Sequence, residues 1–515
     1  MEIIEGRRGR RAASLLLCGA LAVPSACTSS RGPAAVRPPR ATAAPARQAV
    51  RGDLTGDGKA DVVVAASRTP TLYVVPGGKE RPAVIDWSAR VPGNGDPITE
   101  LASADFDGDG RTDVAIGTPQ ADAPGRPRSR MGIVTLLYGT AASPYLGTSR
   151  PVVLDQDHPA LLHPADTRPR YGGRFGAALA TGDFNGDRYP DLAVAAPSAP
   201  GPLLGREPHD PKTGRGALTV FYGGPAGLST RGAQLLVPGE RGVPAGRLGD
   251  LAAADVTGDG NDDLLIGDSA TTRPGDDATE RCVDPDGDEA GHPRPVGMLY
   301  VLRGSAEGLS GRDAQSISGA DAGVEDGFGH YLAAARFRHG SYADVVVYGA
   351  TRRGGRCDEG VLVVLRGGPG GLVPREATTV TGRRPPYSCC GGLATGDVDG
   401  DGDADLLVPA GPYDGAALAW LVPSGHGGLS DRAVPLTARS LGLPPNPVRT
   451  ELALFDVDGD GRDELLAGTM YSKDGGDEIR LVSAALTSSG ATGAVDLTGA
   501  AGDLAGAGPG GEFLR

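Results

Sequence analysis

The stretch Asp105–Gly117, DFDGDGRTDVAIG, places an acidic turn directly before a short apolar run. The same frame, D-x-[DNT]-x-D-G-x-x-[DE], returns along the chain, with small departures, at Asp53, Asp183, Asp255, Asp397 and Asp456. A seventh copy, RFRHGSYADVVVY from Arg336, keeps the frame but is expected to lack its acids. Successive copies start 52 to 81 residues apart, which is room for four strands and their loops. Internal repetition at such a period indicates a propeller or a linear array.

The composition also favours a β-rich repeat protein. The chain has 515 residues with 83 Gly and 43 Pro, and short Val, Leu, Ile and Ala runs recur, which a disordered chain would lack. Each unit adds an entry strand before the turn and a strand with a Gly turn after it, as in RFGAALATGD (174–183) and GALTVFYGGPAGL (216–228). Such a unit cannot bury both faces alone, so seven units are expected to close a ring.

These units resemble the FG-GAP repeats of integrin alpha-subunit propellers and their bacterial relatives. The matching elements are Phe175-Gly176 and Phe328-Gly329 for FG, and, imperfectly, Ala195-Ala196-Pro197, Gly117-Thr118-Pro119 and Gly349-Ala350 for GAP. The resemblance covers about residues 48–500. It implies an all-β fold, a seven-bladed β-propeller of four-stranded blades with calcium loops between the first two strands of most blades. It leaves the function open, because propellers serve many functions.

The acidic frame has the pattern of a calcium loop. Alternate side chains in a tight turn direct oxygens at one centre, Gly at position six allows the bend, and Ca²⁺ takes about six to eight oxygens. Candidate ligands at positions one, three, five and nine are Asp53, Thr55, Asp57, Asp61, Asp105, Asp107, Asp109, Asp113, Asp183, Asn185, Asp187, Asp191, Asp255, Thr257, Asp259, Asp263, Asp397, Asp399, Asp401, Asp405, Asp456, Asp458, Asp460 and Glu464. Position seven, for example Arg111 or Asp403, is expected to offer only its carbonyl. We predict about six structural Ca²⁺ sites; Arg188 in place of Gly weakens the expected bend of the third loop.

Two copies need separate treatment. Arg336 and Arg338 stand at the first two acid positions of their copy, so we expect Arg charge there in place of a cation.

The alternative for every copy is a purely polar turn. Charge argues for metal: without residues 1–26, which hold four Arg and two Glu, the net charge of −14 becomes −16, and six Ca²⁺ would leave about −4. The tripeptide Arg51-Gly52-Asp53 is one that integrins bind, but Asp53 is expected to face the metal of its own loop.

The segment Cys282–His292, CVDPDGDEAGH, offers Asp284, Asp286 and Asp288 but precedes no apolar strand, so it is more typical of an acidic insertion than of an extra metal site. Export favours disulfides, which are expected on the face opposite to the acidic loops. The cysteines available are Cys282, Cys357, Cys389 and Cys390. Their pairing stays open between staples across neighbouring blades and a vicinal bridge.

The N-terminal segment of the chain predicts export. Residues 1–27 have a basic start, an apolar run over Ala12–Val23 and small residues before Cys27, as an export signal has. The letters PSAC resemble a lipobox except at Pro24, so lipidation of Cys27 stays open. Residues 28–47 are interpreted as a flexible Pro/Ala/Arg-rich tether and 501–515 as a disordered Gly-rich tail. No later apolar run reaches about 18 residues, so no transmembrane helix is expected.

The sequence has no nucleophile-elbow, H-E-x-x-H or phosphate-loop motif, and its seven His show no ligand spacing. The acidic balance opposes nucleic-acid binding. We therefore predict a secreted or cell-surface module, monomeric and non-enzymatic, that binds or adheres to a protein or glycan. The loops expected to bind are Gln120–Arg130, Ser198–Arg215 and Ala270–Val296.

Two alternatives remain. One is a hydrolase or lyase acting on extracellular polysaccharide in the central depression of the propeller, and the other is a purely structural surface protein. Converging His, Tyr, Arg and Glu side chains in that depression would favour the enzyme, and an apolar lining would favour the binding module.

Overall fold

The computed structural model describes residues 51–66, 71–77, 83–86, 100–125, 129–147, 151–156, 173–198, 216–239, 243, 248–271, 296–324, 327–353, 356–380, 392–410, 417–444, 449–473, 476–487, 490–496 and 512–513. The chain divides into two units, Met1–Val36 and Arg37–Arg515, and all of these residues belong to the second. The predictions that lie outside the described residues concern the export signal, Cys27, the tether, the segment Cys282–His292, Cys389, Cys390, the Cys357 side chain, and most of the loops 198–215 and 270–296.

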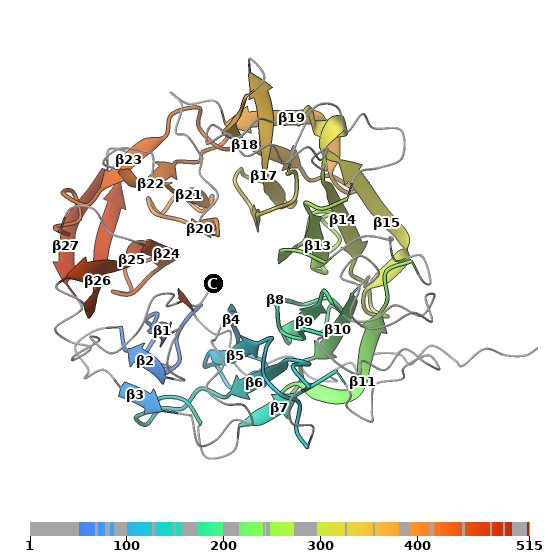
Figure 1. The fold of residues 1–515 in the computed structure, drawn as a ribbon, viewed down its shortest axis with the longest axis horizontal. Helices are drawn as coiled ribbons and strands as arrows, with labels where there is room; N and C mark the ends of the chain where they lie inside the picture. The colour runs from blue at the N-terminus through green and yellow to red at the C-terminus, as the bar shows by residue number, and fades with distance from the viewer. Residues whose placement is uncertain are drawn as a thin grey trace, which may run out of the picture. The chain divides into compact units, whose positions relative to one another are not determined.

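The described residues form seven antiparallel four-stranded sheets, set around a common centre (Figure 1). The first three are β28-β1-β2-β3 (Glu512–Phe513, Val62–Ala66, Thr71–Val75, Ala83–Asp86), β4-β5-β6-β7 (Glu100–Ala104, Asp113–Thr118, Ile133–Leu137, Val152–Leu154) and β8-β9-β10-β11 (Ala178–Gly182, Asp191–Ala196, Ala217–Tyr222, Ser229–Leu236). The next two are β12-β13-β14-β15 (Leu251–Ala254, Asp263–Asp268, Met298–Arg303, Ser310–Ser318) and β16-β17-β18-β19 (Leu332–Ala335, Asp344–Arg353, Arg356–Arg366, Val373–Val380). The last two are β20-β21-β22-β23 (Ala394–Gly396, Asp405–Pro409, Ala417–Val422, Val434–Thr437) and β24-β25-β26-β27 (Arg449–Phe455, Glu464–Lys473, Gly476–Thr487, Gly490–Asp496).

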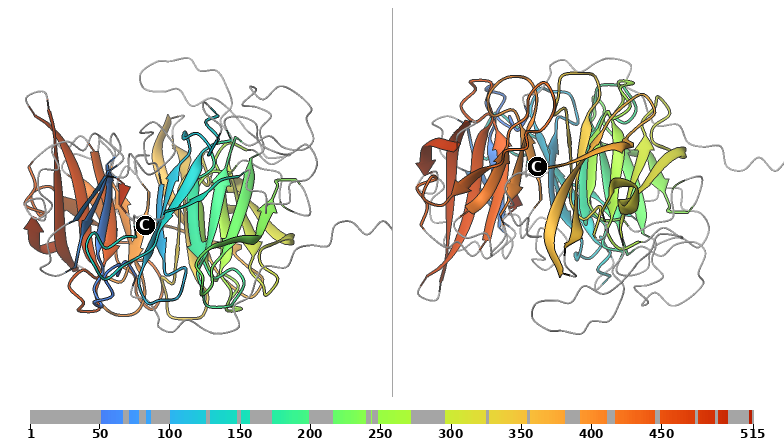
Figure 2. Two further views of the ribbon diagram at one scale, coloured as in Figure 1. Left: turned by 90° about the horizontal axis from the view of Figure 1, so that it is seen from below. Right: turned by 90° about the horizontal axis from the view of Figure 1, so that it is seen from above.

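The apolar runs after the acidic turns become the second strands of the sheets. β5, β9 and β13 are buried along their whole length, whereas most residues of the fourth strands β11, β15 and β19 are half-buried or exposed. Side views show the strands standing side by side with their loops at the two ends (Figure 2). Each hydrophobic cluster combines residues of neighbouring sheets, so the core lies between blades rather than inside one sheet. The predicted all-β propeller of four-stranded blades is confirmed.

The innermost strands contact one another in a closed circuit. Its order is β4, β8, β12, β16, β20, β24, β28 and β4 again. β28 comes from the C-terminal end of the chain and pairs with β1, with Val64 opposite Phe513 and Ala65 opposite Glu512. The prediction of a disordered tail over 501–515 is therefore wrong at Glu512 and Phe513. Pairing with β1 satisfies backbone groups that the first blade would otherwise leave as an open edge.

A single short 3₁₀ helix, η1 (Gly319–Ala322), is present among the described residues. None of the described helices is long and apolar enough to cross a membrane.

Candidate metal sites

The acidic loops connect the first and second strands of their sheets, as the sequence predicts. The loop 105–113 joins β4 to β5, and the loops from Asp183, Asp255, Asp397 and Asp456 occupy the same place in their own sheets. The loop 53–61 precedes β1, because the inner strand of that sheet is β28. All the loops therefore lie at one end of the propeller.

Neighbouring loops are joined through their backbones. The N–H at position eight of one loop donates to the carbonyl at position one of the loop before it. These bonds run from Ala60 to Asp456, Thr112 to Asp53, Asp262 to Asp183, Ala343 to Asp255, Ala404 to Arg336 and Asp463 to Asp397, at 2.7 to 2.9 Å. Pro190 occupies position eight of the third loop and has no N–H to donate. The bond from Ala60 to Asp456 links the first copy to the last, so the ring closes here as well as at β28.

The first carboxylate of each loop is fixed by the backbone of its own turn. Asp53 Oδ1 accepts the N–H groups of Gly56 (2.6 Å) and Asp57 (3.1 Å), and its Oδ2 accepts that of Gly58 (2.8 Å). The other first-position acids, Asp105, Asp183, Asp255, Asp397 and Asp456, accept equivalent bonds from their turns. These bonds orient the carboxylates without a side-chain cation.

The acids at position five are oriented in the same way. Each accepts the N–H of the residue at position seven, at 2.9 to 3.0 Å; they are Asp57, Asp109, Asp187, Asp259, Asp401 and Asp460. At position three, the Thr55 and Thr257 hydroxyls lie 3.3 and 3.4 Å from the first carboxylate, and Asn185 Oδ1 accepts the N–H of Asp187 at 2.9 Å. The sequence-predicted side chains are thus brought together within each turn.

The carboxyl group at position nine ties its loop to another turn of the same blade. In the second loop, Asp113 Oδ2 accepts the Phe106 N–H (2.9 Å) and Oδ1 accepts the Gly139 N–H (2.9 Å). Burial, together with Asp107 and Asp105 nearby, raises the pKa of Asp113 to about 8. Burial likewise raises the pKa of Asp61, Asp263 and Asp405 to about 6, of Glu464 to about 7, and of Asp191 well above its ordinary value. A bound cation would favour the ionised forms that burial disfavours.

In three loops the carboxylate oxygens come within 4.8 Å of one another. These groups are Asp105, Asp107 and Asp113; Asp397, Asp399 and Asp405; and Asp456, Asp458 and Asp460. The candidate metal ligands in these loops are carboxylate oxygens. The other loops have a hydroxyl or amide oxygen at position three. Ca²⁺ binds oxygen ligands in irregular geometry, so the residues fit this ion.

The third loop keeps its bend despite Arg188. This residue has φ 72°, and its N–H donates to Asp183 Oδ2 at 2.7 Å, as the glycines of the other loops do. A left-handed conformation costs an L-residue about 1–2 kcal/mol. The loop therefore adopts the shared geometry with a strained residue.

Within the Arg-Gly-Asp tripeptide, Asp53 is turned into the protein, whereas Arg51 is exposed. Asp53 is 3% exposed, and its carboxylate accepts the bonds of its own turn. The Arg51 guanidinium lies 5.0 Å from the centre of the Phe455 ring and donates to the Thr395 carbonyl at 3.2 Å. The Asp53 carboxylate is thus directed at its own loop, and the Arg51 guanidinium contacts the sixth and seventh blades.

The loop 336–344 has an arginine paired with its position-nine acid. Arg338 Nε and Nη2 donate to the Asp344 carboxylate at 2.9 Å each, and Nη2 also donates to the Gly367 carbonyl at 3.1 Å. The hydrogen bond with Asp344 raises the pKa of Arg338. Asp344 keeps the acid at position nine, so the prediction that this copy lacks the acids is wrong there. The interpretation of Arg charge in place of a cation fits the geometry of Arg338.

Comparison with known proteins identifies the repeat. The FG-GAP repeat family model matches residues 175–221, and the FG-GAP-like repeat model matches residues 53–116. The chain carries integrin-alpha-like FG-GAP repeats. Integrin alpha-PS2 of Drosophila melanogaster is 30% identical over 233 residues (42% of this chain, 15% of the integrin), and integrin alpha-IIb of Homo sapiens is 33% identical over 176 residues (32% and 14%). The predicted resemblance to integrin alpha subunits is confirmed.

The FG-GAP repeats are also similar to part of phosphatidylinositol-glycan-specific phospholipase D of Homo sapiens, at 36% identity over 167 residues (32% of this chain, 18% of that protein). The chain thus spans less than a fifth of the length of these relatives. A Bacillus licheniformis rhamnogalacturonan lyase PL11 structure is 14% identical with a TM-score of 0.33, covering 85% of this chain and 68% of that one. A likeness of this extent supports no conclusion about activity.

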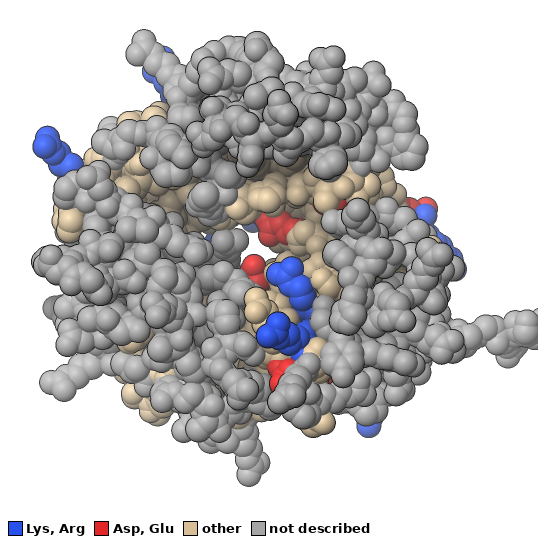
Figure 3. All heavy atoms as spheres, in the orientation of Figure 1, with Lys and Arg blue, Asp and Glu red and all other residues tan. Residues whose placement is uncertain are grey.

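A partly open central cavity of about 170 Å³ lies between the innermost strands of the FG-GAP propeller. Leu and Ala side chains of β4, β8, β12, β16 and β24 form most of its lining, with Glu100, Asp250 and Arg51 among the charged residues. Figure 3 shows the hollow at the centre of one face, with acidic and basic side chains near it. Pockets that hold drug-sized ligands usually measure about 300–1,000 Å³, so this cavity is small for a substrate.

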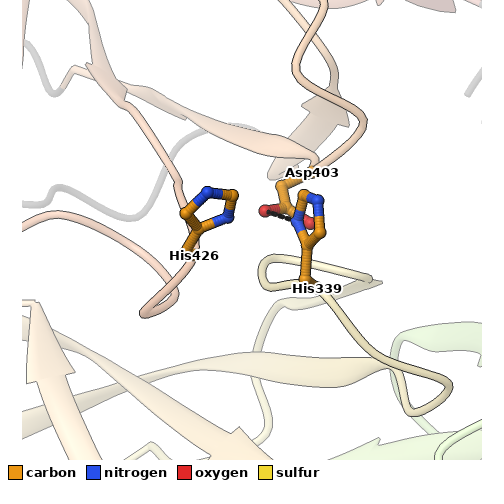
Figure 4. Close-up of side chains that lie close together, drawn as sticks. All are labelled: His339, Asp403 and His426. Atoms are coloured by element: carbon orange, nitrogen blue, oxygen red, sulfur yellow. Dashed lines mark hydrogen bonds and ion pairs between the residues drawn. The ribbon is translucent and has the colours of Figure 1, made fainter.

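One group of side chains escaped the sequence analysis. His339, Asp403 and His426 offer ligand atoms that all lie within 4.8 Å of one another (Figure 4). The histidines show no ligand spacing along the sequence, but the fold brings His339 and His426 close to each other and to Asp403. Two signals were available in the sequence. His339 stands where every other FG-GAP loop has Gly at position four, and His426 stands in the Gly turn 424–429 where the turns 223–228, 304–309 and 367–372 have Pro225, Ala306 and Pro369.

Proposed function

We propose that this chain is an extracellular, calcium-stabilised, seven-bladed FG-GAP propeller that acts as a binding module for a protein or a glycan. The observation that carries the calcium part is the repeated loop geometry. In six loops, side-chain oxygens converge in a turn whose own N–H groups hold the first carboxylate inward.

Calcium in these loops would be structural. Every loop except the third donates a backbone hydrogen bond to the loop before it. The acid at position nine anchors a loop to the turn after the third strand, as Asp61 does with Gly77 (2.8 Å) and Asp263 with Gly304 (3.0 Å). Clustered carboxylates repel one another when no cation is bound. Binding free energy of Ca²⁺ would therefore add to folding free energy.

The small volume of the central cavity, about 170 Å³, supports binding rather than catalysis there. Recognition would fall to the long loops at the end of the propeller opposite to the acidic loops. In the described part of the first such loop, Ser129 Oγ accepts the Ala123 N–H at 3.0 Å and Asp122 Oδ1 accepts the Arg130 N–H at 3.0 Å. A loop fixed in this way is a preorganised surface, which reduces the cost of ordering on binding.

Export and location belong to the same proposal. An extracellular site agrees with the integrin alpha relatives, and residues 1–27 would direct the chain there, with Cys27 as the point of any lipid anchor. We propose that the exported chain is a monomer.

The test is a glycan array together with a panel of purified surface proteins, probed by the exported chain in calcium and again in EGTA. We expect a ligand that is retained in calcium and lost in EGTA, and lost when residues 199–214 are replaced by a short Gly/Ser linker. A matched variant with Ser440→Ala, in a turn of the sixth blade, should bind normally. Binding that survives both EGTA and the loop replacement would contradict the proposal.

One observation favours an enzyme as the second candidate. The His330, Tyr331 and Tyr348 rings pack together next to β16, with centroids 4.5 to 6.5 Å apart, and His330 Nδ1 lies 3.3 Å from Ser269 Oγ. Leu332, two residues on, lines the central cavity. His and Tyr are residue types used for general acid–base catalysis. Depolymerisation of acidic or neutral polysaccharides that is lost in His330→Ala would support this function, and inactivity on such a panel would remove it.

A further inference from the structure

We propose that His339, Asp403 and His426 bind one divalent transition-metal ion, with Zn²⁺ as the best fit. The site differs from the acidic loops in chemistry and lies between the fifth and sixth blades. It would use side chains that the calcium sites do not use, and it does not depend on the ligand of the propeller.

The three residues lie in three different strand connections, all at the end of the propeller that carries the acidic loops. His339 lies between β16 and β17, Asp403 between β20 and β21, and His426 between β22 and β23. His339 Nδ1 lies 2.6 Å from Asp403 Oδ2, and the two imidazole centroids are 4.6 Å apart with perpendicular planes. Figure 4 shows the Asp403 carboxylate directed toward both rings. The Asp403 side chain is only 3% exposed, whereas the His339 side chain is 58% exposed.

The backbone around each donor is fixed. The Ala404 N–H, next to Asp403, donates to the Arg336 carbonyl at 2.7 Å. This bond joins the loop of Asp403 to the loop of His339. The Ser424 N–H donates to Asp405 Oδ1 at 2.6 Å, which attaches the turn of His426 to the loop of Asp403. Within that turn, Gly428 N–H donates to the Gly425 carbonyl at 2.8 Å. Two of the three connections are thereby locked to the third, and such support holds donors in place for a metal.

The pair His339 and Asp403 occupies a contact that recurs around the ring with different residues. Elsewhere position four is Gly, and a β-carbon there would meet the position-seven side chain of the next blade. Such contacts pair Gly56 with Arg111, Gly186 with Asn261, Gly258 with Tyr342, Gly400 with Arg462 and Gly459 with Lys59. Between the fifth and sixth blades, an imidazole and a short carboxylate replace this arrangement. His426, in the Gly turn after β22, adds a second imidazole at the same place.

The donor set selects the ion. Ca²⁺ prefers oxygen ligands alone, whereas imidazole nitrogen suits Zn²⁺ and neighbouring transition metals. Two His and one carboxylate resemble an open zinc site, with water in the fourth position. Zinc–ligand distances of about 2.0–2.2 Å in a tetrahedron would separate His339 Nδ1 from its carboxylate partner by about 3.3 Å. The present 2.6 Å contact would then lengthen by less than 1 Å, which the exposed His339 ring can provide.

A metal here would clamp the two blades where the loop 336–344 has Arg338 in place of a cation. Asp403 would contribute to two ions. Its backbone carbonyl would bind the calcium of the loop 397–405, and its carboxylate would bind the zinc. The alternative is a simple His339–Asp403 ion pair with no metal.

The test is zinc titration of the full exported chain in saturating calcium, followed by calorimetry and by metal analysis after gel filtration. We expect one tightly bound Zn²⁺ per chain. His426→Gln should weaken zinc binding by more than the about 10- to 100-fold that loss of a ligand's hydrogen-bond partner costs. His330→Gln, at the other end of the propeller, is the matched control and should bind zinc as the wild type does.

A second readout separates this site from zinc in the acidic loops. Co²⁺ at the site should give the visible absorption bands of a nitrogen-ligated ion, and these bands should disappear in His426→Gln and in His339→Gln while calcium stoichiometry stays unchanged. Zinc binding that is absent in the wild type, or equally strong in His426→Gln, would overturn the proposal. His426 is exposed in a turn, so its replacement should leave the fold intact, and an unchanged melting temperature in calcium checks this.

Discussion

Replacing Arg338 with Ala tests whether an arginine does the work of a cation in the fifth blade. The Asp344 side chain is 2% exposed, and it accepts bonds from Arg338 Nε and Nη2 and one from the Gly367 N–H at 2.9 Å. Arg338→Ala would leave this carboxylate buried with its backbone partner alone. Removing one partner of a buried pair costs about 3–5 kcal/mol, and because the Arg338 side chain is 22% exposed we expect the lower end, about 3 kcal/mol.

The assay is urea unfolding in saturating calcium, combined with hydrogen exchange of the β16–β17 region. Arg111→Ala is the matched control, because Arg111 pairs with Asp109 at 3.1 Å with both side chains 28 to 42% exposed; that change should cost under about 1 kcal/mol. Adding Asp344→Asn to Arg338→Ala should recover part of the loss, since the orphaned charge is removed. Equal effects of the two Arg substitutions would refute the idea that Arg338 replaces a cation.

Three further predictions follow from the acidic loops. Arg188→Gly should stabilise the protein by about 1 kcal/mol by relieving a left-handed residue, whereas Gly260→Ala, with φ 88° and open space for a methyl group, should destabilise it by a similar amount; thermal melts in calcium check both. Asp53→Ala should remove one Ca²⁺ per chain and Arg51→Ala none, and neither should change attachment of integrin-bearing cells; attachment lost equally in both would restore the adhesive function. In EGTA, the protein should gain stability as pH falls from about 8 to 5, because the folded state keeps the Asp113 proton up to about pH 8 while the unfolded state releases it near pH 4. Asp113→Asn should reduce this gain, and a metal-free protein that is most stable at pH 8 would contradict it.

The repeat frame made most of the fold predictable. An acidic turn followed by a buried apolar run, as at Asp105–Gly117, contains both the loop and the second strand, and the spacing between copies fixes the four-stranded unit. Local geometry also followed, since positions one, five and nine of each loop are held by bonds within the same blade. The inward orientation of Asp53 could therefore be inferred from its place in the frame.

What the sequence could not provide depends on contacts that the repeat frame does not specify. β28 is two residues in a Gly-rich segment, and it becomes a strand only because the open edge of β1 lies beside it. Arg188 adopts the bend because the carboxylate of Asp183 binds its N–H, which outweighs the preference of its backbone. His339, Asp403 and His426 meet because the ring places adjacent blades side by side, and no spacing along the chain reports that.

The central claim is that the acidic loops are structural calcium sites, and the most direct measurement is calcium content and melting temperature on the same exported chain. After dialysis against low free calcium, we expect about six Ca²⁺ per chain, and removal by EGTA should lower the melting temperature by about 10 °C or more, because binding energy contributes to folding. A chain that holds no calcium at micromolar free ion and melts at the same temperature with and without EGTA would contradict the account.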